Sequence, residues 1–242
     1  MNATHLRDYL ADRLALLEER VRHACARAGR PRSSVTLVAV TKYVGPTAAT
    51  VLTELGVRDL GESRPQELWR KAAALPDGVR WHLIGHLQRN KIERTLPLVH
   101  LIHAADSMRL LEALNAEAVR RGRQTPVPVL LEVNASREAN KSGFAPAEVP
   151  GLAAALTGLR RLRVRGLMTM AAETDDPEDC RPTFAELRRL RERLQAEVGD
   201  AHQLEHLSMG MSNDFEAAIE EGATLIRVGS ALFEGVPDEG AD

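Results

Sequence analysis

The chain has 242 residues, of which 44% are hydrophobic and 27% are charged, so it can bury a substantial core as an ordinary globular protein. Its 32 Lys and Arg residues nearly balance 34 Asp and Glu residues, and the formal net charge of −2 argues against the large positive field of a nucleic-acid-binding protein. Apolar runs are too short to cross a bilayer and the first residues mix charges with apolar side chains, so we expect a cytoplasmic protein with no membrane partner.

An amphipathic helix is expected at the start of the chain. Apolar residues recur there at three- and four-residue steps, at Leu6, Leu10, Leu14, Leu17, Val21 and Cys25. This helix should end near Gly29 and Pro31, which favour termination.

Eight short apolar segments follow, and each is expected to form a strand. They are 35–41, 57–62, 80–85, 99–106, 127–134, 163–170, 205–212 and 224–230. Longer amphipathic segments between them, such as 64–75, 107–121 and 182–198, can cross back over a sheet and make the next strand parallel. The alternation predicts a single (β/α)8 barrel domain over residues 1–242 with an extra N-terminal helix, and a doubly wound open sheet is the alternative fold.

In such a barrel the residues that end the strands meet at one mouth, where active sites lie. They include Lys42, Glu62, Ser63, His82, Gly85, Asn134, Met168, Met170, Ser208, Arg227, Gly229 and Ser230. Lys42 stands out because an amine in a partly buried place can attack an aldehyde. The alternative is that Lys42 is simply the first solvated residue of a loop.

The loops after the last two strands have the composition of a phosphate site. "SMGMS" and "VGS" contain Gly210 and Gly229, which let backbone N–H groups approach an anion, and Ser208 and Ser230, which can donate hydroxyl hydrogen bonds. Loops in this place bind phosphate in many barrels of this kind. The alternative is that glycine and serine only make turns there.

Six segments together resemble the pyridoxal-phosphate homeostasis protein family. They are "VAVTK", "LGESRPQE", "WHLIGHLQRNK", "LLEVNASREANKSGF", "VRGLMTM" and "LSMGMSNDFEAAIEEGATLIRVGSALF", collinear from residue 35 to about 235. The resemblance implies a barrel of the alanine racemase N-terminal domain type that holds pyridoxal 5′-phosphate as a Schiff base on Lys42.

The resemblance also implies roles for other residues at the mouth. Ser208, Gly229 and Ser230 would hold the phosphate, and Arg227 would face the pyridine nitrogen. The further cofactor-binding residues that we expect are Ser63, His82, Asn134, Met168, Met209 and Gly210. Two positions depart from the family pattern, because Ser63 stands where asparagine is usual and Ser230 where threonine is more frequent.

The function that the resemblance implies is a carrier and buffer of pyridoxal phosphate without classical turnover. It would be a monomer or weak dimer that hands the cofactor to apo forms of pyridoxal-phosphate enzymes. A fixed positive charge from Arg227 beside the ring nitrogen would weaken the cofactor as an electron sink.

Two enzymatic alternatives remain. An amino-acid racemase needs a second acid or base opposite the lysine, but Tyr9 lies in the first helix and Tyr43 should point away from Lys42 because strand side chains alternate. A Schiff-base aldolase for a phosphorylated sugar would use the same lysine and phosphate loops.

A metal site is not expected. His82 and His86 lack a third nearby ligand, and Asp176 before Pro177 is typical of a helix N-cap. Cys25 and Cys180 are too far apart in sequence to indicate a disulfide framework or a cysteine metal site.

Overall fold

The eight expected strands form a closed parallel barrel that follows chain order from β1 to β8, with β8 beside β1. This computed structural model describes residues 2–138 and 140–237. The strands are β1 (Thr36–Val40), β2 (Asp59–Glu62), β3 (Arg80–Leu83), β4 (Val99–Ala105), β5 (Val127–Glu132), β6 (Leu162–Met168), β7 (His206–Ser208) and β8 (Leu225–Val228). The (β/α)8 prediction is therefore confirmed, and the open-sheet alternative is wrong.

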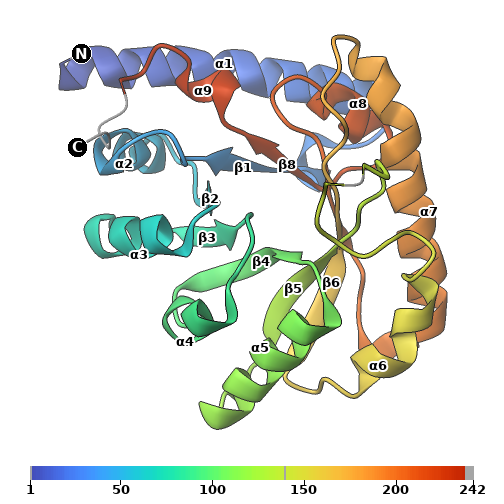
Figure 1. Ribbon diagram of the computed structural model, residues 1–242. Coiled ribbons are helices and arrows are strands. Elements are labelled where there is room, and N and C mark those ends of the chain that lie inside the picture. Colours follow the sequence, from blue (N-terminus) through green and yellow to red (C-terminus); the bar gives the residue numbers. More distant parts are fainter. Residues whose placement is uncertain (1, 139, 238–242) are drawn as a thin grey trace.

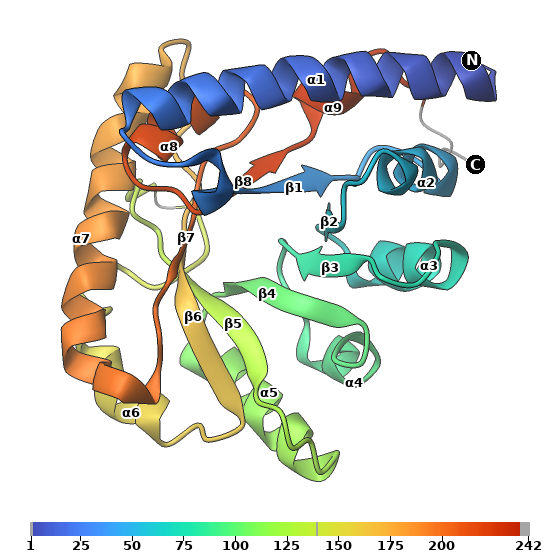
Figure 2. The ribbon, with the colours of Figure 1, turned by 180° about the vertical axis from the view of Figure 1, so that it is seen from behind.

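Helices surround the barrel (Figures 1 and 2). They are α1 (Ala3–Arg27), α2 (Pro46–Glu54), α3 (Pro65–Ala74), α4 (Ile92–Thr95), α5 (Met108–Arg120), α6 (Ala153–Thr157), α7 (Arg181–Val198), α8 (Phe215–Glu220) and α9 (Ser230–Phe233), with short 3₁₀ turns η1 (Arg32–Ser34), η2 (Arg89–Lys91), η3 (Pro150–Leu152), η4 (Pro177–Cys180) and η5 (Gly199–Ala201). Local chemistry starts several of them. Asn2 and Ser107 cap α1 and α5 by accepting backbone N–H bonds, and Asp176 caps η4 as its sequence predicts.

The seventh strand is shorter than its apolar segment suggests. β7 ends at Ser208, and the chain turns at Gly210 with φ of +93°, a conformation that favours glycine. A Cβ at Gly210 would lie 2.6 Å from Ala218 Cβ and 2.9 Å from Phe215 Cα, both on α8. Close packing of this turn on α8 therefore ends the strand and places residues 209–214 in a loop.

The expected N-terminal helix is α1, which runs along α8 and α9 in both ribbon views (Figures 1 and 2). Its apolar stripe is buried, with Leu10 and Val21 fully covered. Tyr9 donates a hydrogen bond to the carbonyl of Glu234, which ties the first helix to the segment after α9. The first and last elements thus share one side of the barrel.

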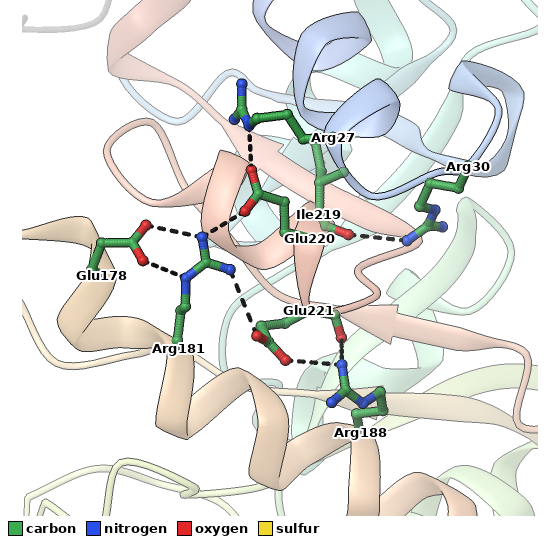
Figure 3. Close-up of polar contacts among 8 residues, drawn as sticks. All are labelled: Arg27, Arg30, Glu178, Arg181, Arg188, Ile219, Glu220 and Glu221. Atoms are coloured by element: carbon green, nitrogen blue, oxygen red, sulfur yellow. Dashed lines mark hydrogen bonds and ion pairs between the residues drawn. The ribbon is translucent and has the colours of Figure 1, made fainter.

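A group of ion pairs joins α8 to two neighbours (Figure 3). Arg27 of α1 donates to Glu220 at 2.6 Å, and Arg181 of α7 donates to the same carboxylate at 2.5 Å. Arg181 also pairs with Glu178, and Arg188 pairs with Glu221 at 2.8 Å. The end of α8 is therefore held from both sides by arginines.

The interior of the barrel contains an apolar cluster distinct from the larger core beneath the helices. It consists of Val38, Leu101, Ala104, Leu130, Met168 and Leu225. Buried polar side chains share this interior with the apolar cluster, and they lead to the site described next. Within the described ranges, no helix has the length and apolarity needed to span a membrane.

Candidate functional site

Lys42 lies two residues beyond β1, with its side chain exposed. Its Nζ is 4.6 Å from the centre of the Tyr43 ring, within the range of a cation–π contact. Two expectations are therefore wrong: Lys42 is not partly buried, and Tyr43 does not point away from it. The reason is that β1 ends at Val40 and a turn follows, closed by a bond from Val44 N to Thr41 O, so strand alternation no longer applies.

A buried ion pair holds the residue that precedes Lys42. Lys71 Nζ donates to Glu62 Oε1 at 2.5 Å and to the carbonyl of Thr41 at 2.6 Å. Thr41 Oγ1 donates to the same Glu62 oxygen at 2.6 Å. The side chains of Lys71 and Glu62 are 1% and 0% exposed, so this cluster is a fixed base for the turn that carries Lys42.

Sequence reasoning placed Glu62 at the mouth but missed Lys71. The signal was present, because Lys71 lies three residues after Leu68 and four before Leu75, on the apolar stripe of α3. A charged residue in an apolar stripe indicates a buried partner.

The loops after β7 and β8 lie against each other. Arg227 N donates to Gly210 O at 2.9 Å, and Ala231 N donates to Ser212 Oγ at 3.2 Å. Within the described residues, no hydrogen bond is found from the backbone N–H groups of Gly210, Ser212 and Gly229. Two adjoining loops therefore present unpaired donors, which suits an anion.

The same loops reach the end of β1. A Cβ at Gly229 would lie 3.2 Å from Val40 O and 3.3 Å from Val40 Cβ, so the loop and the strand are in close contact at this position. Ser230 is exposed at the start of α9. The β8 loop therefore lies against the carboxyl end of β1, the strand that Lys42 follows.

Ser208 and Arg227 lie inside the barrel, behind these loops. Arg227 Nη1 donates to Ser208 Oγ at 2.6 Å, and Nη2 donates to Thr169 O at 2.9 Å. Burial lowers the pKa of Arg227 to about 10, against the opposing charges of Asp214 and Glu132, so it stays a cation at neutral pH. Ser208 is fully buried, whereas Ser212, which sequence reasoning did not select, is the half-buried serine of the loop itself.

His82 belongs to a chain of hydrogen bonds that continues inward from Ser208. Ser208 Oγ is 2.8 Å from His103 Nδ1, and His103 Nε2 is 2.8 Å from His82 Nδ1. His82 Nε2 is in turn 2.9 Å from Asp59 Oδ1. Both ring nitrogens of His82 are therefore engaged inside the barrel, and His103 and Asp59 are polar residues that strand patterns alone did not reveal.

Burial and pairing set the charge states along this chain. Burial would raise the pKa of Asp59, but hydrogen bonds from His82 and Arg80 outweigh it and lower the pKa, so Asp59 is a carboxylate. Burial lowers the pKa of His103 well below its ordinary value. His103 is therefore a neutral imidazole at neutral pH.

Asn134, Met168 and Met209 do not direct free polar groups to the mouth. The Asn134 amide donates to the carbonyls of Glu138 and Lys141 at 2.8 and 3.3 Å and so holds its own loop. Met168 belongs to the apolar cluster inside the barrel, and Met209 is fully buried.

Ser63 is half-buried directly after β2, where it packs closely on the next strand's loop. A Cβ at Gly85 would lie 2.3 Å from Ser63 O, so glycine is needed at position 85.

The two histidines that were considered as a metal pair have different partners. His86 Nδ1 is 2.6 Å from Asp106 Oδ2, whereas the ring of His82 faces Asp59. In the ranges 2–138 and 140–237, no group of three His, Cys, Asp or Glu side chains is arranged to hold a metal ion.

Comparisons with known proteins agree with this architecture. Residues 13–237 match the model of the family described as "Alanine racemase, N-terminal domain". The chain is 41% identical over 223 residues to the pyridoxal phosphate homeostasis protein of Aquifex aeolicus, covering 92% of this chain and 96% of that one. It is 40% identical to the protein of the same name from Pseudomonas aeruginosa, covering 96% and 97%.

Solved structures give the same picture. The crystal structure of an unknown protein from Bifidobacterium adolescentis has a TM-score of 0.87 at 37% identity, covering 95% of this chain and 96% of that chain. The structure of PipY from Synechococcus elongatus with pyridoxal phosphate bound has a TM-score of 0.79 at 34% identity, covering 93% and 99%.

Proposed function

This chain belongs to the pyridoxal phosphate homeostasis proteins, within the alanine racemase N-terminal domain family, and on that premise we propose that it binds pyridoxal 5′-phosphate in intracellular vitamin B6 homeostasis. The observation that carries the proposal is the meeting of three kinds of group at one end of the barrel. They are the exposed amine of Lys42, the unpaired N–H groups of the β7 and β8 loops, and the buried cation of Arg227.

The donor set fits the chemistry of this cofactor. A phosphate accepts hydrogen bonds from backbone N–H groups and hydroxyls, and Ser212 and Ser230 add hydroxyls to the unpaired N–H groups. Bound pyridoxal phosphate would supply an aldehyde that bonds to amines and a ring that accepts electrons. Lys42 would hold the aldehyde, and the Thr41–Glu62–Lys71 cluster would keep its turn in place.

Arg227 supports a carrier over an enzyme. A guanidinium donates hydrogen bonds but does not give up its proton, so it would leave the ring nitrogen unprotonated and the ring a weak electron sink. Tyr43 lies beside the Lys42 amine and so does not provide a separate base on an opposite face. We therefore propose a cytoplasmic, single-domain carrier, monomer or weak dimer, that hands the cofactor to apo-enzymes without turnover of its own.

Trapping the cofactor tests this proposal. Borohydride reduction of the purified protein with pyridoxal phosphate, followed by peptide mass spectrometry, should place the adduct on Lys42. The Lys42→Ala variant should form no adduct but still bind pyridoxal phosphate weakly as the free aldehyde, whereas Lys91→Ala, at a half-exposed lysine of η2, should behave as the wild type.

Three outcomes would contradict parts of the proposal. An adduct on Lys91 or Lys141 would remove Lys42 from its role. A protein that binds no pyridoxal phosphate but is trapped by borohydride with a phosphorylated sugar would support the aldolase alternative. Substantial turnover of a common amino acid by the pure protein would support a racemase or related enzyme.

A further inference from the structure

The hydrogen-bonded chain inside the barrel connects its amino-terminal end to the proposed cofactor site. Asp59 is the first residue of β2, and Ser208 and Arg227 lie near the carboxyl ends of β7 and β8. His82 and His103 bridge the distance between them. All five side chains are at most 8% exposed, so solvent does not compete for these bonds.

The Asp59 end of this hydrogen-bonded network fixes the first bond, and the number of protons on each imidazole fixes the direction of the others. The Asp59 carboxylate only accepts, so His82 Nε2 must carry a proton and donate it. With one proton on each imidazole, His82 Nδ1 accepts, and the proton in that bond belongs to His103 Nε2. Because His103 is a neutral imidazole, its Nδ1 is then an acceptor, and the bond to it is donated by the hydroxyl of Ser208.

We propose that His82 and His103 each carry a single proton, on Nε2, and act with Asp59 as positioning residues that direct the Ser208 hydroxyl proton into the barrel, so that the Ser208 oxygen accepts from Arg227 and holds that guanidinium at the site. The inference rests on the proposed function, because it concerns the place that Arg227 takes toward the cofactor ring. Bonds that all run in one direction polarise each other, which strengthens the oxygen as an acceptor.

This arrangement changes the role of Ser208. Its proton is committed to His103 and its oxygen to Arg227, so it is not a hydroxyl donor for the phosphate. Ser212, in the loop after β7, and Ser230, at the start of α9, are left for that task. The hydrogen-bonded network therefore gives the two serines of the motif "SMGMS" different functions: Ser208 positions Arg227, and Ser212 is available to the phosphate.

Nitrogen NMR on the cofactor-free protein tests the direction of the bonds. Two-bond ¹H–¹⁵N correlation spectra at neutral pH should show His82 and His103 as neutral rings protonated on Nε2. In Asp59→Ala, a buried N–H on His82 Nε2 would lack its acceptor, so both rings should shift their proton to Nδ1. Glu205→Gln is the matched control, because Glu205 is an exposed carboxylate that precedes β7 and takes no part in the hydrogen-bonded network. This variant should leave the protonation of both rings unchanged.

Equilibrium dialysis with pyridoxal phosphate tests the link to Arg227. Ser208→Ala removes the acceptor of a charged donor and should weaken retention roughly tenfold, while leaving the Nε2 protonation that Asp59 imposes. Asp59→Ala should weaken retention less, because Ser208 then accepts from His103 as well as Arg227. If Asp59 and Ser208 only filled space, their substitution would not change ring protonation in one variant and cofactor retention mainly in the other.

The outcomes separate this inference from the proposed function. A wild-type protein with either ring protonated on Nδ1 or doubly protonated would overturn the inference, even if Asp59→Ala failed to fold. Unchanged rings in Asp59→Ala, or unchanged retention in Ser208→Ala, would overturn it too. A wild-type protein that retains no pyridoxal phosphate would refute the proposed function. The NMR result on the cofactor-free protein would still decide the direction of the hydrogen bonds between Asp59 and Ser208.

Discussion

At the scale of single residues, Lys71 shows how a charged group can be part of a barrel core. Burying an ammonium group without partners is strongly unfavourable. Glu62 and the Thr41 carbonyl accept hydrogen bonds from Lys71 in place of water and so offset this cost. The second carboxylate oxygen of Glu62 has no hydrogen-bond partner within the described residues. The hydrogen bonds that Oε1 accepts from Lys71 and Thr41 therefore stabilise this carboxylate.

Removing one member of this pair should be costly. Lys71→Met leaves a buried, uncompensated carboxylate, and we expect the free energy of unfolding in urea to fall by about 3–5 kcal/mol. Lys71→Met combined with Glu62→Gln removes the stranded charge and should recover part of that loss. Lys91→Met, at a half-exposed lysine, should change stability by about 0.5 kcal/mol or less. A Lys71→Met variant as stable as this control would contradict the structural role.

Two hydroxyls at the mouth are expected to bind the phosphate group of the cofactor and not its ring. The double variant Ser212→Ala, Ser230→Ala should bind pyridoxal phosphate roughly tenfold more weakly, because two hydrogen bonds to a charged group are lost. Pyridoxal, which lacks the phosphate, should bind nearly as it does to the wild type. Equilibrium dialysis with both compounds measures the difference, and Ser136→Ala, in the loop after β5, is the control. Equal losses for both compounds would place these serines elsewhere in the site.

At the scale of elements, the contacts of Glu220 explain how the short helix α8 is anchored between α1 and α7 (Figure 3). Partial burial would raise the pKa of Glu220, but hydrogen bonds from Arg181 and Arg27 outweigh it, and the pKa is lowered. A carboxyl with a depressed pKa in the folded state contributes stability above its unfolded pKa. That contribution is lost as the pH falls through the lower, folded value.

Glu220→Gln should therefore be less stable than the wild type at pH 7, by about 1 kcal/mol or less for a pair this close to solvent. The difference should shrink as the pH falls below about 4, where the wild-type carboxyl also becomes neutral. Urea unfolding across this range checks both points. The control is Glu54→Gln, whose exposed pair with Arg7 joins α1 to α2. A difference that stays constant down to pH 2 would exclude the ion pairs as its source.

Elements were more predictable than the site. Short apolar runs located all eight strands because the strands are largely buried on both faces, and the end of β7 was misplaced further than any other strand end. That end decides which serine of "SMGMS" faces the interior, and it depends on how Gly210 packs on α8, a contact between segments that periodicity does not encode. Likewise, the sequence indicated that β1 ends close to Lys42, but the exposure of the Lys42 side chain depends on the turn that follows the strand.

At the scale of the whole molecule, the closed barrel should unfold as one unit. We propose that residues 1–242 form a single domain, because β8 pairs with β1 and no strand edge separates two halves. Far-UV circular dichroism reports all helices, whereas fluorescence reports Trp69 on α3 and Trp81 on β3. Their urea transitions should coincide, and clearly separate midpoints would indicate more than one folding unit.

The packing of α1 on α8 and α9 has a consequence for biosynthesis. The ribosome makes α1 first, but the surfaces that cover Leu10, Leu17 and Val21 include elements from residue 215 onward. Closing contacts this distant in sequence costs chain entropy, and it cannot occur until α8 and α9 have left the exit tunnel. Until α8 and α9 emerge, the nascent protein therefore carries a partly uncovered apolar helix, and during this period chaperone binding limits aggregation.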